Sequence, residues 1–165
     1  MLSKTIQKAF DTQIKDELES AYLYLSMSSY CNAESLFGFG KWLRMQAQEE
    51  LGHGMKLFDY VHHRGGHVAL QGIEEPKADF KNMQELFKIV LEHEQKVTGR
   101  IHKLYEMSTK ENDYASEIEL QWFITEQVEE EQNATTIVEQ LKMIGDNKAA
   151  LLMMDKEMAG RSTAG

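Results

Sequence analysis

Proline occurs only once in the 165 residues of this chain, at Pro76, and no other feature constrains the fold as much. A proline inside a helix removes a hydrogen bond and clashes with the preceding turn, so the long segments without proline are free to form uninterrupted helices. Pro76 lies in a stretch of about 17 residues, 65–81, that opens with two glycines. The sequence therefore predicts long helices on both sides of one long connection.

Turn-forming residues divide the chain into helical segments. Gly65 and Gly66 end one of them in a C-cap, and Gly145 ends another. Asn82 can cap the start of a helix, with Glu85 three residues later in the arrangement of a capping box. We expect five helices, over residues 3–31, 35–64, 82–110, 114–144 and 147–159.

The long connection also predicts how the helices are arranged. It can reach roughly 55 Å when extended, whereas a helix of about 29 residues is about 44 Å long. It can therefore span the full length of a bundle, which leaves the second and third helices parallel, while the short links make the other neighbours antiparallel. The predicted fold is all-α: one domain over residues 1–165, a four-helix bundle with up-down-down-up topology and one long crossover, followed by a short fifth helix.

Charge and cysteine content exclude several functions. A formal net charge of −9 would repel the phosphates of nucleic acid and attract cations. Cys31 is the only cysteine, which excludes an internal disulfide and a metal site made of cysteines alone, and favours a reducing compartment. The chain has no apolar run of the roughly 20 residues that cross a membrane, and its start does not resemble a signal peptide. We expect a cytoplasmic protein with no nucleic-acid or membrane partner.

Each of the four long helices carries an apolar stripe that a carboxylate interrupts near the middle of the helix. The four glutamates are Glu17, Glu50, Glu94 and Glu130. His53 lies one turn after Glu50, and Gln127 lies one turn before Glu130. Helix midpoints coincide in a bundle whichever way each helix runs, so the four carboxylates should lie in one buried layer.

A layer of four buried carboxylates needs cations. A single glutamate on an apolar stripe usually reaches out to water. Four at one height repel one another, by about 4 kcal/mol for two charges 4 Å apart at an effective dielectric of 20. Their total charge of −4 is balanced by two divalent metal ions. Oxygen ligands with one histidine favour iron or manganese over copper or structural zinc, so the spacing predicts a two-metal site.

Two runs of sequence resemble the signature segments of prokaryotic non-haem ferritins. They are residues 46–53, QAQEELGH, and residues 122–131, WFITEQVEEE; Glu17 with Tyr24, and His93 with Glu94, match the same family. The resemblance covers essentially the whole chain. It implies a ferritin-like fold and one subunit of a 24-subunit shell, which oxidises ferrous iron with dioxygen or peroxide and stores the ferric product as mineral.

The resemblance also implies roles for individual residues. Glu17, Glu50 and His53 would hold the first iron ion. Glu50 would bridge to a second ion, which Glu94 and Glu130 would also hold. Gln127 would be a hydrogen-bonding neighbour of this pair, and Tyr24 would lie beside it. A third iron site, which similar bacterial ferritins use, would be formed by Glu49, Glu126 and Glu129 with the shared Glu130.

Differences from the motifs of related di-iron families show which of these families the chain does not resemble. Gln127 and Glu130 replace the second Glu-x-x-His motif of many di-iron bundles, which argues against bacterioferritin and rubrerythrin. Leu51 stands where bacterioferritin has a haem-ligating methionine, so no haem is expected, and Cys31 cannot replace the four cysteines of rubrerythrin. Two alternatives stay open: a di-iron peroxidase or hydroxylase that keeps its iron, and a metal-free interaction bundle.

Several features lie outside this site. His62, His63 and His67 cluster at a helix end, which fits either a solvated end or an accessory metal site. The apolar residues 21–25 and 151–154 suggest contacts between subunits. The resemblance places the fifth helix along a four-fold channel of the shell. Glu129, Glu130 and Glu131 are consecutive and cannot share one helix face, so we expect Glu131 to be solvated.

Overall fold

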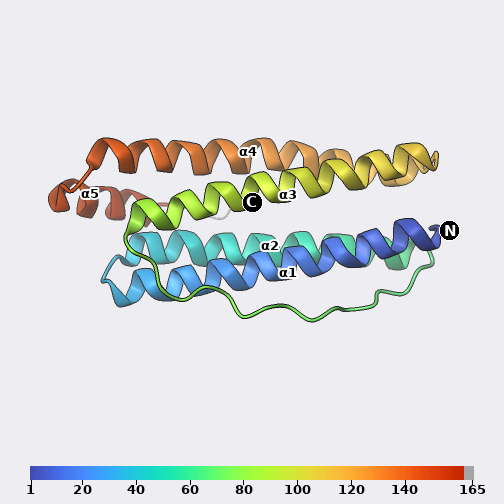
Figure 1. Cartoon of the computed structure of the whole chain (residues 1–165), viewed down its shortest axis with the longest axis horizontal. Helices are drawn as coiled ribbons and strands as arrows, with labels where there is room; N and C mark the ends of the chain where they lie inside the picture. Colours follow the sequence, from blue (N-terminus) through green and yellow to red (C-terminus); the bar gives the residue numbers. More distant parts are fainter. Residues whose placement is uncertain (162–165) are drawn as a thin grey trace.

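Four long helices lie side by side in the computed structural model, and a short fifth helix lies at one end of them (Figure 1). The structure describes residues 1–161. The helices are α1 (Lys4–Ala33), α2 (Phe37–His63), α3 (Met83–Lys110), α4 (Tyr114–Ile144) and α5 (Lys148–Met158). The predicted all-α four-helix bundle with a short fifth helix is confirmed, and helix ends differ from the prediction by a few residues only. No helix within residues 1–161 combines the length and the apolar character that crossing a membrane needs.

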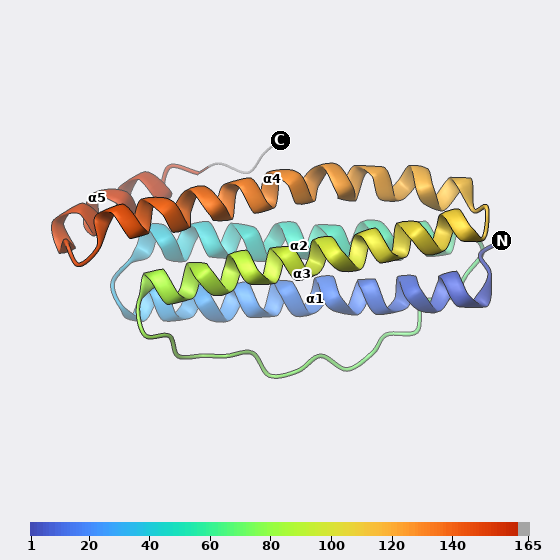
Figure 2. The ribbon, with the colours of Figure 1, turned by 45° about the horizontal axis from the view of Figure 1, so that its top comes forward.

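The connection between α2 and α3 runs along the outside of the bundle for its full length (Figures 1 and 2). The α2 and α3 helices therefore run in the same direction, as the length of the connection predicted. Four hydrogen bonds join the extended segment to α1; in the two shortest, Gln7 donates to the His67 carbonyl oxygen at 2.7 Å and Ser26 donates to the Lys77 carbonyl oxygen at 2.9 Å. Phe80, near its end, is buried in the core.

Side chains of short polar residues begin most of the helices. The Asn82 side chain accepts the Glu85 backbone N–H at 2.9 Å, as predicted. The Glu85 carboxylate accepts the N–H of Lys81 at 2.6 Å, one residue earlier than in a standard capping box. The α2 helix has no such local cap, since its N-cap residue is Leu36. The missing acceptor comes from α5, where Asp155 Oδ1 accepts the Phe39 N–H at 2.9 Å.

Two apolar clusters fill the two halves of the bundle, and a polar layer separates them. On α1, Glu17 lies between Ile14 of one cluster and Tyr24 of the other. On the other three helices, too, a glutamate lies between a residue of one cluster and a residue of the other. The flanking pairs are Ala47 and Leu57 around Glu50, Val90 and Val97 around Glu94, and Phe123 and Ala134 around Glu130. The four glutamates therefore occupy the level of the bundle between its two apolar halves.

The α5 helix packs onto its own bundle. Met154 is 5% exposed and joins the cluster at the α5 end of the molecule, whereas Leu152 is 54% exposed. A Cβ at position 38 would lie 1.6 Å from the Asp155 carbonyl oxygen, so only glycine permits the close approach of α5 to α2. The fifth helix thus has one face packed on the bundle and one apolar face exposed.

Candidate metal centre

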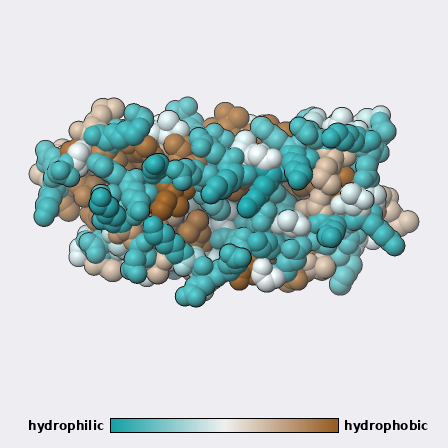
Figure 3. Space-filling model, in the orientation of Figure 1, coloured by the Kyte–Doolittle hydropathy of each residue, from teal (hydrophilic) through white to brown (hydrophobic). Residues whose placement is uncertain are grey.

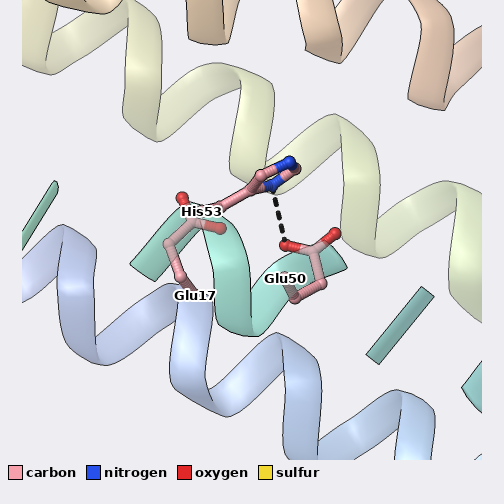
Figure 4. Close-up of side chains that lie close together, drawn as sticks. All are labelled: Glu17, Glu50 and His53. Carbon is pink, nitrogen blue, oxygen red and sulfur yellow. Dashed lines mark ion pairs between the residues drawn. The ribbon is translucent and has the colours of Figure 1, made fainter. Parts of the chain in front are cut away.

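Glu17 of α1 points into the same space as Glu50 and His53 of α2 (Figure 4). One ligand atom of each residue lies within 4.8 Å of the others, and all three residues are buried. His53 Nδ1 lies 3.5 Å from Glu50 Oε2. The i, i+3 spacing of Glu50 and His53 puts both on one face of α2. The structure therefore brings together the residues expected to hold the first iron ion.

Glu94 of α3 has donors on both of its carboxylate oxygens. The Tyr24 hydroxyl donates to Oε1, and Gln127 Nε2 donates to Oε2 at 3.2 Å. Both donors hold the carboxylate in one orientation, and neither needs to be charged. Tyr24 and Gln127 thus both lie beside Glu94, which the sequence predicts to be a ligand of the second ion.

Glu130 of α4 is linked to Glu50 through Gln46. Gln46 Nε2 donates to Glu130 Oε2 at 2.8 Å and to Glu50 Oε1 at 3.4 Å. Among the neighbouring charges, that of Glu94 has the largest effect on the pKa of Glu50 and on the pKa of Glu130, and it raises both. Glu50 therefore neighbours both Glu17 and His53 on one side and the pair formed by Glu94 and Glu130 on the other.

Burial raises the pKa of all four carboxyl groups. For Glu17 the next cause is the charge of Glu50, and its pKa lies well above the usual value. Burial and the charge of Glu94 likewise hold the pKa of Glu50 well above its usual value. The pKa of Glu94 is raised by burial despite its two hydrogen-bond donors. Burial and the charge of Glu94 raise the pKa of Glu130 to about 7.

Among the described residues, one fully buried carboxylate oxygen of this layer has no hydrogen-bond partner. Gln13 donates to Glu17 Oε1 at 2.7 Å, but Glu17 Oε2 is fully buried without a hydrogen bond. A buried acceptor without a partner costs free energy unless a cation or a proton satisfies it. The donor set of four carboxylates and one imidazole fits ferrous iron, which binds oxygen and imidazole ligands.

The three further residues expected at a third iron site are less buried than the four glutamates of the layer. Glu49 and Glu126 are half-buried, and Glu129 is exposed. In the described part of the chain, only Glu17, Glu50 and His53 form a group of three acidic or histidine ligands within reach of one ion. The Glu49 carboxylate is bound by Arg161, whose Nη2 donates to Oε2 at 2.6 Å.

The comparisons with known proteins agree with this geometry. Residues 7–144 match the ferritin family, described as a ferritin-like domain. The chain is similar to the bacterial non-heme ferritins of Staphylococcus aureus (strain NCTC 8325 / PS 47) and Staphylococcus haemolyticus, with 40% and 41% identity over 162 residues and 98% of each chain covered. A crystal structure of an open pore ferritin from the archaeon Archaeoglobus fulgidus has a TM-score of 0.97 and 49% identity, over 98% of this chain and 100% of that one. The chain belongs to the ferritin family. The resemblance to prokaryotic non-haem ferritins is thus confirmed, and it supports iron storage as the function.

The sequence did not point to several polar neighbours of this ferritin's carboxylate layer. Gln13 and Gln46 each lie four residues before a buried glutamate, Glu17 and Glu50, and donate to it. This i, i+4 spacing of amide and carboxylate is visible in the sequence and could have identified both. No local spacing could have identified Arg161, because it reaches the site only through the docking of α5.

Two surface features of this ferritin can also be compared with the sequence. The prediction that Glu131 is solvated is wrong: its side chain is half-buried and accepts a hydrogen bond from Thr98 at 2.5 Å, because the neighbouring α3 helix covers it.

His62, His63 and His67 are exposed, and the rings of His62 and His67 lie 6.4 Å apart. Among the residues described, these histidines are not part of a three-ligand metal group.

Proposed function

We propose that this ferritin oxidises ferrous iron at the buried carboxylate layer and stores the ferric product inside a 24-subunit shell. Iron is the substrate and the cargo, and no haem takes part. The residues proposed to hold the two ferrous ions are Glu17, Glu50, His53, Glu94 and Glu130. A cytoplasmic location, a single domain over residues 1–165, and the absence of nucleic-acid and membrane partners remain predictions from the sequence.

The observation that carries this proposal is the burial of four carboxylates, one from each long helix, in one layer. Glu17, Glu50, Glu94 and Glu130 are between 1% and 7% exposed. Their raised pKa values mean that the metal-free layer holds protons up to a higher pH than exposed carboxylates would. Two ferrous ions would displace these protons and balance four carboxylate charges. The orphaned Glu17 Oε2 would gain a ligand.

The chain's own residues orient the ligands and hold the protons. Tyr24 and Gln127 fix Glu94, while Gln46 fixes Glu130 relative to Glu50. Each ferrous ion gives up one electron. Two electrons and two protons convert dioxygen to hydrogen peroxide, and the same numbers convert hydrogen peroxide to two waters. A pair of ions therefore matches the electron count of either oxidant.

Apolar surface on the bundle supports assembly into a shell. A shallow hollow between α1 and α2 is lined by Leu18, Ala21, Tyr22, Leu25, Arg44, Ala47, Gln48, Leu51 and Ile73. Tyr22, Leu25 and Leu51 are exposed, which is costly in an isolated chain. On the face drawn in Figure 3, apolar side chains gather mostly over the half of the molecule that carries α5. We infer that copies of the chain cover these surfaces.

Oxidation kinetics of Glu50→Ala test the site. Glu50 would contact both ions, so this variant should lose rapid oxidation of ferrous iron while its helical content stays the same. The matched control is Glu106→Ala, which removes an exposed glutamate from α3. Rapid oxidation in Glu50→Ala, at the rate of the wild type, would refute the assignment.

A further inference from the structure

The segment after α5 returns to α2, where Arg161 contacts three α2 side chains. Arg161 Nη2 donates to Glu49 Oε2 at 2.6 Å, and Nη1 donates to Gln46 Oε1 at 2.9 Å. Its guanidinium carbon lies 4.5 Å from the centre of the Trp42 ring, in a cation–π contact. Positions 42, 46 and 49 lie on one face of α2. The Arg161 side chain is 19% exposed, so it is held in a partly buried slot.

The docking of α5 brings Arg161 to this slot. Asp155 accepts the Phe39 N–H, and Lys41 Nζ donates to the Ala159 carbonyl oxygen at 2.6 Å. Gly38 allows the close contact between the two helices. These contacts join the first turns of α2 to α5 and to the residue after it. The position of Arg161 thus depends on α5 being docked.

Arg161 is connected to the carboxylate layer through Gln46. An amide side chain has one acceptor end and one donor end. Because Arg161 donates to Gln46 Oε1, Gln46 Nε2 faces the carboxylates and donates to Glu130 Oε2 at 2.8 Å. Arg161 therefore fixes the orientation of the amide that contacts Glu130.

Arg161 also balances the negative charge of Glu49, which a bound metal cation could balance instead. Its donors form a charge-assisted bond with the carboxylate. A metal ion that binds Glu49 Oε2 must replace that bond, since the two cations use the same oxygen atom.

We propose that Arg161 is a positioning residue that competes with metal ions for Glu49 and so controls occupancy of the third site. This inference rests on the proposed third site at Glu49, Glu126, Glu129 and Glu130. A cation that binds Glu49 displaces Arg161 and loosens the end of α5. By reciprocity, undocking of α5 increases the affinity of the third site for the cation.

Zinc binding tests the competition without redox chemistry. Calorimetric titration of the assembled protein with Zn²⁺ should show binding beyond two ions per chain, and Glu49→Gln should weaken that additional binding. Arg161→Gln should strengthen it about three- to tenfold, because a competing partly exposed ion pair is lost. A purely structural arginine would give the opposite sign. The matched control is Lys156→Gln, which removes one exposed positive charge from α5 and should change nothing.

Two further measurements separate the possible outcomes. In a Glu49→Gln background, Arg161→Gln should have no additional effect on zinc binding. In a Trp122→Phe background, Trp42 is the only tryptophan, and zinc should change its fluorescence only while Arg161 is present. Unchanged or weaker binding in Arg161→Gln, or an effect that persists without Glu49, would overturn the role of Arg161. A wild type that binds no zinc beyond two ions per chain would overturn both the third site and this role, but normal iron oxidation would leave the two-iron site standing.

Discussion

Replacing Glu130 with glutamine should stabilise the metal-free protein. Burial and the charge of Glu94 raise the pKa of Glu130 from an ordinary 4.5 to about 7. A carboxyl group with a raised folded-state pKa binds more protons when folded than when unfolded. The contribution of Glu130 to the free energy of folding therefore becomes more unfavourable as pH rises from about 4.5 to about 7, and it is constant above pH 7.

The size of this effect follows from the pKa shift. At 1.36 kcal/mol per unit, the raised pKa of Glu130 costs about 3 kcal/mol of stability at pH 8, and about 1 kcal/mol at pH 5. Glu130→Gln removes the charge and keeps an oxygen that can accept the hydrogen bond from Gln46. At 2–4 °C per kcal/mol for a chain of this size, the metal-free variant should melt roughly 6–12 °C higher than the wild type at pH 8.

Glu94→Gln is a poorer choice for this test. Tyr24 and Gln127 donate to both oxygens of Glu94, so the amide nitrogen of a glutamine would face a donor and lose a hydrogen bond. The stability of metal-free Glu94→Gln would reflect both the lost charge and the lost hydrogen bond. Only one oxygen of Glu130 has a hydrogen-bond donor among the described residues.

The assay is differential scanning calorimetry of chelator-treated wild type and Glu130→Gln at pH 5 and pH 8. The gain in melting temperature should be larger at pH 8. The stabilisation that Zn²⁺ adds under anaerobic conditions should be smaller in the variant, because one ligand charge is missing. A fall in the apo melting temperature at pH 8, with unchanged stabilisation by metal, would refute the reasoning and make Glu130 a structural partner.

Three other substitutions test different parts of the structure. Tyr24→Phe removes the hydroxyl that donates to Glu94, so Zn²⁺ binding to the two-ion site should weaken roughly tenfold in a calorimetric titration; unchanged affinity would contradict a role in orienting Glu94. Gly38→Ala should destabilise the protein by roughly 1–3 kcal/mol, because its Cβ meets the α5 backbone. The control Gly52→Ala, with open space around it, should stabilise the protein by up to about 1 kcal/mol. Equal denaturation midpoints of the two variants would contradict the close contact with α5. Leu152→Glu should weaken the proposed shell, since Leu152 is 54% exposed on the free face of α5. Unchanged assembly by size-exclusion chromatography would show that this face is not in a subunit contact.

Much of the fold could be predicted because its determinants are local. Apolar stripes, glycines and Asn82 indicate where helices run and end, and the connection is long enough to predict that α2 and α3 are parallel. The four glutamates could be recognised because each interrupts an apolar stripe at mid-helix, which the separation of the two apolar clusters explains.

The contacts that depend on docking could not be predicted in the same way. The sequence indicated subunit contacts for Leu151, Leu152, Met153 and Met154 together, but only the structure separates the buried Met154 from the exposed Leu152. Asp155 as a cap for α2, and Arg161 as a partner of Glu49, join residues more than 100 positions apart. Such contacts arise from the packing of α5 and have no periodic signal.

Iron loading of the assembled protein tests the central claim most directly. The purified protein would be given ferrous iron in air at increasing ratios, and iron and protein would be assayed in each fraction from size-exclusion chromatography. We predict that iron elutes with the assembled shell in large excess over two ions per chain, and that Glu50→Ala slows this loading. Iron that stops at two ions per chain would instead indicate a di-iron enzyme that keeps its metal, and a protein peak without iron would contradict the metal site itself.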